Sequence, residues 1–87
     1  METSAWSMQV ASDVLRDGLG VELLDASRSI RAEVFRCDAD NTVVVVYSGG
    51  GRPPIDVLDW FYAEAMVRLG TFEDGSPLPA RREWRGV

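Results

Sequence analysis

The chain has 87 residues, of which 46% are hydrophobic and 26% charged, and it carries a net charge of −5. This length allows a single domain, and this composition is that of a folded globular protein rather than a disordered chain. The negative charge disfavours binding to nucleic acid or to anionic membranes, because both need clustered positive charge.

Two features of the composition limit the available chemistry. Histidine is absent, and Cys37 is the only cysteine. The chain therefore lacks the commonest general base, the usual partner of a serine or cysteine nucleophile, and the commonest transition-metal ligand. A single cysteine also excludes an intrachain disulfide and a cysteine-rich zinc site. We expect a protein that is not an enzyme, with no catalytic residues, no metal site and no cofactor.

The first residues lack the basic and apolar regions of a signal peptide, and no apolar run approaches the roughly 20 residues of a membrane span. We therefore expect a cytoplasmic protein without membrane contact. All nine basic residues are arginine, which is typical of the codon usage of a GC-rich bacterial genome.

The N-terminal segment fits two structures. Trp6, Met8 and Val10 alternate with smaller or polar residues, as in a strand. The same segment also fits a helix that begins at Thr3 or Ser4 and stops at Gly18, with helical spacing of Val10, Ala11, Val14 and Leu15. The helix is slightly favoured, and both alternatives stay open.

Three strands are predicted next, over residues 21–25, 29–37 and 42–47. The last contains four consecutive valines, which favour strands and suggest burial on both faces. The intervening turn ends at Asn41, which tolerates a positive φ, so the second and third strands should form a hairpin.

Pairing Cys37 with Thr42 and Leu23 with Ile30 divides this sheet into two faces. The face available to a helix collects Val21, Leu23, Ile30, Ala32, Val34, Val43, Val45 and Tyr47. The second face collects Leu24, Phe35, Cys37, Val44 and Val46, together with a Glu22–Arg31 pair across strands. It is half apolar, and a single helix would leave it uncovered.

The strongest element is an amphipathic helix from about Pro54 to Leu69, with Asp56 in its first turn and Gly70 as its stop. The stripe expected to face the core contains Ile55, Leu58, Tyr62, Ala65, Met66 and Leu69, with Phe61 at its margin. Trp60 and Val67 fall on the opposite face, which is therefore less polar than a solvated helix face.

These elements predict a two-layer α+β domain over residues 1–74. The C-terminal helix packs on an antiparallel sheet. If the N-terminal segment is a strand, the sheet has four strands. If that segment is a helix, the sheet has three strands and two helices pack on it. Residues 75–87 contain two prolines, three of the nine arginines and only one of the fourteen acids. We expect an irregular, basic tail anchored by Trp84, packed on the acidic body or on a second copy.

The glycine-rich connection between the last strand and the helix could hold an anion. Backbone N–H groups of Gly49, Gly50 and Gly51 precede a helix, and Arg52 could assist them. The run lacks the lysine and hydroxyl residue of a P-loop, so a flexible connector is the competing interpretation.

Exposed apolar residues predict an interface, because monomers seldom leave contiguous apolar patches uncovered and tryptophan is enriched at binding hot spots. The candidate interface residues are Trp60, Val67, Phe35, Val44, Val46 and Trp84.

The leading hypothesis is a non-enzymatic module for protein–protein interaction that forms a homodimer through a sheet face or edge. The acidic body would also suit an immunity protein, an antitoxin or a phage-defence inhibitor. The alternative from another class is a small-ligand or anion-binding domain that uses the Ser48–Arg52 loop.

Overall fold

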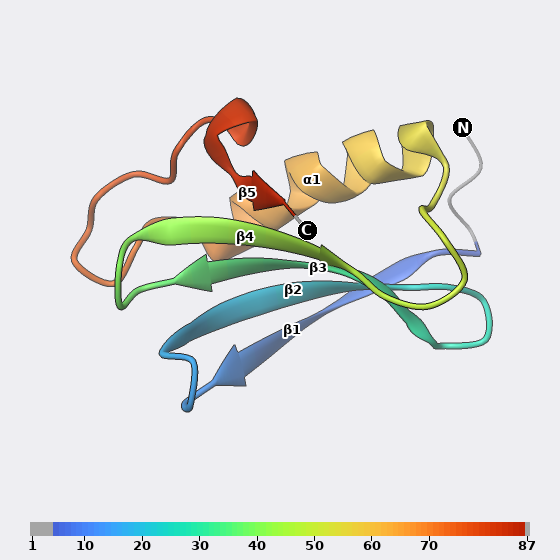
Figure 1. Cartoon of the computed structure of the whole chain (residues 1–87), viewed down its shortest axis with the longest axis horizontal. Helices are drawn as coiled ribbons and strands as arrows, with labels where there is room; N and C mark the ends of the chain where they lie inside the picture. Colours follow the sequence, from blue (N-terminus) through green and yellow to red (C-terminus); the bar gives the residue numbers. More distant parts are fainter. Residues whose placement is uncertain (1–4, 87) are drawn as a thin grey trace.

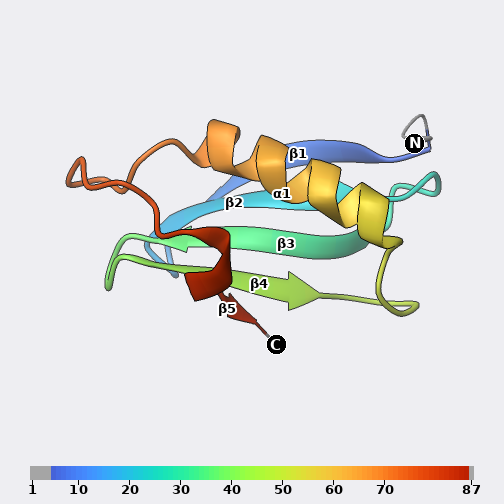
Figure 2. The same ribbon diagram turned by 90° about the horizontal axis from the view of Figure 1, so that it is seen from above.

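The structure is a computed structural model that describes residues 5–86. Within this range the elements are β1 (Ser7–Asp13), β2 (Gly18–Leu24), β3 (Ile30–Cys37), β4 (Thr42–Tyr47), α1 (Ile55–Leu69), the 3₁₀ turn η1 (Arg81–Glu83) and β5 (Arg85–Gly86). The strands form one sheet in chain order (Figure 1), with antiparallel pairing except between β4 and β5, which are parallel. Helix α1 crosses one face of this sheet diagonally (Figure 2), which confirms the α+β class.

The N-terminal segment is the strand β1, so the helix that the sequence slightly favoured is wrong. β1 pairs with β2 over its whole length, and Met8, opposite Leu23, packs against the core. Of the apolar residues that suggested this helix, Val14 and Leu15 lie in the turn after the strand and are 92% and 100% exposed. Pairing with β2 satisfies the backbone hydrogen-bonding groups of this segment, and it decides in favour of the strand over the helix.

The register between β2 and β3 differs from the prediction by two residues. Leu23 lies opposite Ala32 rather than Ile30, and Ile30 is 41% exposed instead of belonging to the core. The cause is a longer turn than expected: the Asp25 carboxylate accepts hydrogen bonds from the backbone N–H groups of Ser27 and Ser29, at 2.9 and 3.1 Å. A shift of two residues leaves the other side chains on their predicted faces.

The same shift breaks the predicted Glu22–Arg31 pair. Glu22 lies opposite Glu33, and its carboxylate accepts a hydrogen bond from Gln9 at 2.6 Å. Arg31 instead pairs with Asp25 at 3.4 Å. The β3–β4 hairpin, in contrast, has the predicted register.

Helix α1 is rotated relative to its predicted orientation. Its buried residues are Val57, Leu58, Phe61, Ala65 and Leu69, so Phe61 is central rather than marginal. Ile55 is 72% exposed, and Tyr62 lies at the edge of the helix–sheet contact. This orientation buries the apolar Phe61 ring and lets the Tyr62 hydroxyl reach a partner, whereas a central Tyr62 would bury an unpaired hydroxyl.

The core lies between α1 and the face of the sheet that α1 covers. Its buried members are Val21, Leu23, Ala32, Val34, Val43, Val45, Val57, Leu58, Phe61, Ala65, Leu69 and Phe72. Alternate residues of β4 contribute to it, namely Val43 and Val45, whereas Val44 and Val46 point to the other face and are half-buried. The run of four valines is therefore fully buried on one face only.

The C-terminal segment returns to the sheet after the helix. Trp84 donates its indole N–H to the carbonyl oxygen of Pro79 at 3.1 Å and packs against the core. Arg81 lies 3.7 Å from the Asp59 carboxylate on α1. Arg85 and Gly86 then pair with Val44 and Val45. Most of this segment has no regular structure, but its end forms the fifth strand.

The end of α1 is tied to the sheet by Arg36. Its guanidinium donates hydrogen bonds to the carbonyl oxygens of Leu69 and Thr71, at 2.6 and 2.7 Å, where the helix dipole favours a cation. It also donates to the Asp38 carboxylate at 3.0 Å, and both side chains are largely shielded from solvent. Asp38 in turn accepts the backbone N–H of Glu73 at 3.0 Å.

Two glycines of β2 clear space on the face that α1 leaves open. A Cβ atom at Gly18 would overlap the Phe35 ring and the carbonyl oxygen of Arg36. A Cβ atom at Gly20 would meet the Glu33 carboxylate. The larger side chains of β3 therefore lie across β2 instead of standing away from the sheet.

We predict that Gly18→Ala lowers the free energy of unfolding by about 1–3 kcal/mol, because the new methyl group overpacks against Phe35 and a backbone carbonyl. Gly50→Ala is the matched control, since its Cβ would make only ordinary contact with Arg31. Urea unfolding of both variants measures the difference. Equal midpoints for the two variants would contradict the close packing at Gly18.

We predict that Arg36→Met lowers the free energy of unfolding by about 3 kcal/mol, because it leaves the shielded Asp38 carboxylate without its cation. The double substitution Arg36→Met with Asp38→Asn should recover part of this loss, since no charge then remains unpaired. Thermal unfolding followed by circular dichroism tests both. A loss of stability in the double variant equal to the sum of the losses in Arg36→Met and in Asp38→Asn alone would show that the pair is not coupled.

Candidate functional site

Strand β4 separates two surface depressions on opposite faces of the sheet. Its side chains alternate, so Val45 and Tyr47 point to the helix side while Val44 and Val46 point to the open face. β5 borders both depressions, because Gly86 lines the first and Arg85 the second.

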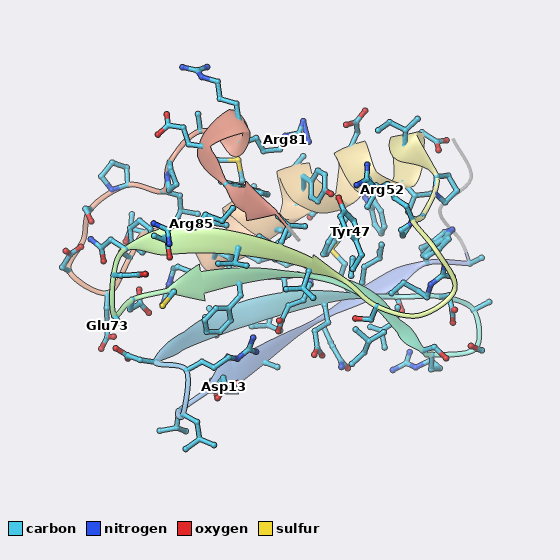
Figure 3. The ribbon with its side chains drawn as sticks, in the orientation of Figure 1. Asp13, Tyr47, Arg52, Glu73, Arg81 and Arg85 are labelled. Carbon is cyan, nitrogen blue, oxygen red and sulfur yellow. The ribbon has the colours of Figure 1, made fainter. Side chains whose placement is uncertain are left out.

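The depression on the helix side, which we call the aromatic hollow, has a volume of about 400 Å³. It lies between β4, α1 and the C-terminal segment and is lined by Val45, Tyr47, Arg52, Tyr62, Arg81, Trp84 and Gly86. Figure 3 shows Tyr47, Arg52 and Arg81 gathered on this side of β4. Its lining contains two cations and no acid.

Aromatic rings and guanidinium groups alternate around the aromatic hollow. The guanidinium carbon of Arg52 lies 4.8 Å from the centre of the Tyr47 ring, and that of Arg81 lies 5.3 Å from the centre of the Tyr62 ring. Trp84 packs edge-on against Tyr62 with ring centres 5.7 Å apart. These cation–π and aromatic contacts hold the groups of the hollow in place.

The two tyrosine hydroxyls of the aromatic hollow are hydrogen-bonded to each other. Burial raises the pKa of Tyr62, and the hydrogen bond with Tyr47 raises it further, so the Tyr62 phenol is neutral at physiological pH. In such a pair one hydroxyl donates to the other, and the accepting hydroxyl keeps its own proton available for a third group.

The depression on the open face, which we call the valine hollow, has a volume of about 330 Å³. It is lined by Arg16, Phe35, Cys37, Asp40, Thr42, Val44, Val46 and Arg85. Val44 and Val46 supply apolar surface, the Phe35 ring is largely covered, and the charged lining residues are Arg16, Asp40 and Arg85. The Thr42 hydroxyl donates to Asp40 and lowers the pKa of its carboxyl group, which keeps an anion in this lining.

The turn between β1 and β2 folds back over part of the open face. Arg16 donates two hydrogen bonds to the Glu33 carboxylate, both 3.0 Å long, and one to Asp13 at 2.5 Å. Its guanidinium carbon lies 4.0 Å from the centre of the Phe35 ring. As a result, Phe35 is only 4% exposed, although no helix covers it. The hydrogen bond from Arg16 lowers the pKa of Asp13.

The predicted interface residues are distributed over the molecule rather than brought together. Val44 and Val46 line the valine hollow with a largely covered Phe35. Trp60 is half-buried and packs against the core, Trp84 lines the aromatic hollow, and Val67 is 77% exposed on α1. Trp60 and Val67 therefore do not form one exposed apolar face.

The prediction did not include Val14 and Leu15, which are among the most exposed large apolar side chains in residues 5–86. They occupy the tip of the β1–β2 turn. This turn extends to the side of the sheet opposite α1 (Figure 1). Two adjacent apolar residues between Asp13 and Arg16 could have indicated an exposed turn, had the segment been assigned as a hairpin.

Of the residues in the predicted anion loop, Arg52 lines the aromatic hollow, and the three glycines do not. The carbonyl oxygens of Gly50 and Gly51 accept hydrogen bonds from Arg31 at 3.1 and 3.0 Å, and Gly51 donates its N–H to Gly49. The loop is thus held by a cation of β3, and the side chain of Arg52 reaches the aromatic hollow.

A third depression, of about 320 Å³, lies at the end of the sheet near the β1–β2 turn and includes Asp17, Arg36, Asp38 and Glu73. Arg36 and Asp38 are occupied with each other and with backbone groups. Over residues 5–86, no three acidic or cysteine side chains are grouped as a metal site would require.

The part of the chain that the structure describes has no helix with the length and apolar character needed to cross a membrane. Comparison of the chain with models of protein families, with curated proteins and with solved structures gave no match. The function is therefore inferred from the geometry of the two hollows that share β4.

Proposed function

We propose that the chain is a non-enzymatic interaction module that pairs with a second copy of itself through the open face of the sheet. The observation that carries this proposal is the presence of an apolar projection and an apolar depression on the same face. The projection is the turn tip with Val14 and Leu15, and the depression is the valine hollow.

A twofold axis makes these two features complementary. In a symmetric dimer each residue that contacts a partner residue is contacted by its equivalent in return. The turn tip of one copy would enter the valine hollow of the other, and the reverse contact would form at the same time. The lining of the valine hollow contains both Arg85 and Asp40, so opposite charges are available to face each other across the axis.

The size of the open face limits the strength of such a dimer. The four long strands β1–β4, spaced by about 4.8 Å and about 24 Å long on average, give roughly 450 Å² per copy and about 900 Å² in total. This area is below that of a standard interface, so we expect a dissociation constant on the order of micromolar or weaker. Burial of each leucine or valine at the contact should contribute about 1.5–3 kcal/mol before the cost of association.

We predict that Leu15→Asp shifts the dimer to monomer, because it places a charge where an apolar side chain would enter the partner. Leu15 is fully exposed, so this substitution should leave the stability of the monomer within about 0.5 kcal/mol. Sedimentation velocity from about 0.5 μM to 1 mM protein measures the association, a range that includes micromolar and weaker dissociation constants.

Val67→Asp is the matched control, since Val67 is also exposed but lies on α1. It should dimerise as the unsubstituted chain does. A chain that stays monomeric throughout the concentration range would overturn the proposal. Loss of the dimer in Val67→Asp, with Leu15→Asp unaffected, would also overturn it and place the interface on the helix.

A further inference from the structure

We infer that the aromatic hollow binds a small ligand that carries a phosphate monoester next to a planar ring. This site is on the helix side of β4, on the face of the sheet opposite to the proposed dimer contact. Three properties of the hollow support the inference: its charge, its free hydrogen-bond donors and its aromatic walls.

The charge of the hollow is opposite to that of the whole protein. The chain has a net charge of −5, yet the lining of the hollow carries Arg52 and Arg81 and no acid. None of the acids in residues 5–86 lies within ion-pair distance of Arg52. Because Arg52 has no acidic partner within this range, it raises the local preference for an anion.

Arg81 has a partner that a ligand could displace. Its nearest acid is Asp59, at 3.7 Å, and that carboxylate is 65% exposed. Exposed pairs of this kind contribute little to stability, because water screens both charges. A phosphate dianion that accepts hydrogen bonds from the planar edges of two guanidinium groups would be the stronger partner.

The tyrosine pair adds a donor. Because Tyr47 and Tyr62 hydrogen-bond to each other, one of the two hydroxyl protons is free to point into the hollow. A phosphate oxygen at this point would accept from the phenol and from the flanking guanidinium groups. The two hydroxyls come from β4 and α1, and the two guanidinium groups come from the Ser48–Pro54 loop and η1. Folding therefore brings these four groups together.

The walls of the hollow suit a planar ring. Trp84 is fixed by its hydrogen bond to Pro79 and by its contact with Tyr62, so its remaining surface is available for stacking. The volume of about 400 Å³ lies in the range of small-molecule sites. Aryl phosphates and mononucleotides share the required chemistry, and the experiment separates them.

Isothermal titration calorimetry with inorganic phosphate, phenyl phosphate, AMP and adenosine tests the inference. We expect phenyl phosphate or AMP to bind more tightly than inorganic phosphate, and adenosine to show no binding. The stronger of the two organic phosphates identifies the source of the ring. Absence of heat for all three phosphates at about 10 mM, a concentration that would reveal even millimolar affinity, would overturn the inference.

Substitutions test whether the hollow is the binding site. Arg52→Ala and Arg81→Ala should each weaken binding about 10- to 100-fold, the usual effect of losing a charge-assisted contact. Arg68→Ala removes the same charge from the far end of α1 and should change affinity less than about twofold. Arg81→Lys keeps the positive charge. Weaker binding in Arg81→Ala than in Arg81→Lys would therefore show that the charge matters, and not only a local change in η1.

Equal affinity in Arg52→Ala and in the unsubstituted chain would exclude the hollow as the site. Equal binding of adenosine and AMP would overturn the role of the phosphate. The titrations should be repeated on Leu15→Asp, whose substitution lies on the opposite face. Binding retained in this variant separates the ligand site from the proposed dimer.

Discussion

One helix covers one face of a five-stranded sheet, and most other features of the molecule follow from this arrangement. Phe61 and its neighbours on α1 pack against alternate residues of β2, β3 and β4, which buries one side of these three strands. A helix is about 10 Å wide, so it cannot cover a sheet of this width completely. The open face and the margin beyond β4 must be completed by turns, by the C-terminal segment or by other molecules.

The chain completes these two regions in different ways. On the open face, Arg16 closes over Phe35 and is held there by Glu33 and Asp13, so a charged side chain shields an aromatic ring. Beyond β4, the C-terminal segment adds β5 and places Trp84 and Arg81 beside the tyrosine pair. Neither region is fully closed, and the two remaining hollows are the places where a partner or a ligand would find the best surface.

Much of the fold could be predicted from local patterns in the sequence. The valine strand, the hairpin that turns at Asn41 and the helix that ends before Gly70 all depend on propensity and turn chemistry, which are local properties. The N-terminal strand could not be separated from a helix, because the turn residues Val14 and Leu15 add helical spacing to the alternating pattern before them. The Asp25 turn was longer than its sequence suggested, since a side-chain hydrogen bond sets its length.

The hollows were only partly predictable. Val44, Val46, Trp84 and Arg52 could be selected as exposed apolar or cationic residues, but their grouping depends on which strands lie side by side. The role of Arg16 depends on a turn folding over a distant strand and on the two glycines that leave room beneath it. The Tyr47–Tyr62 contact requires the actual rotation of α1, which differs from the one that maximises apolar burial by simple periodicity.

The parallel pairing of Arg85 and Gly86 with β4 has a consequence for communication within the molecule. These two consecutive residues border opposite hollows, so the barrier between the hollows is a single layer of backbone. A ligand or partner that displaced β5 at one hollow would change the lining of the other hollow at the same time. Thermodynamic linkage makes any such influence mutual: a ligand that tightened the association of two copies would itself be held more tightly by the associated form.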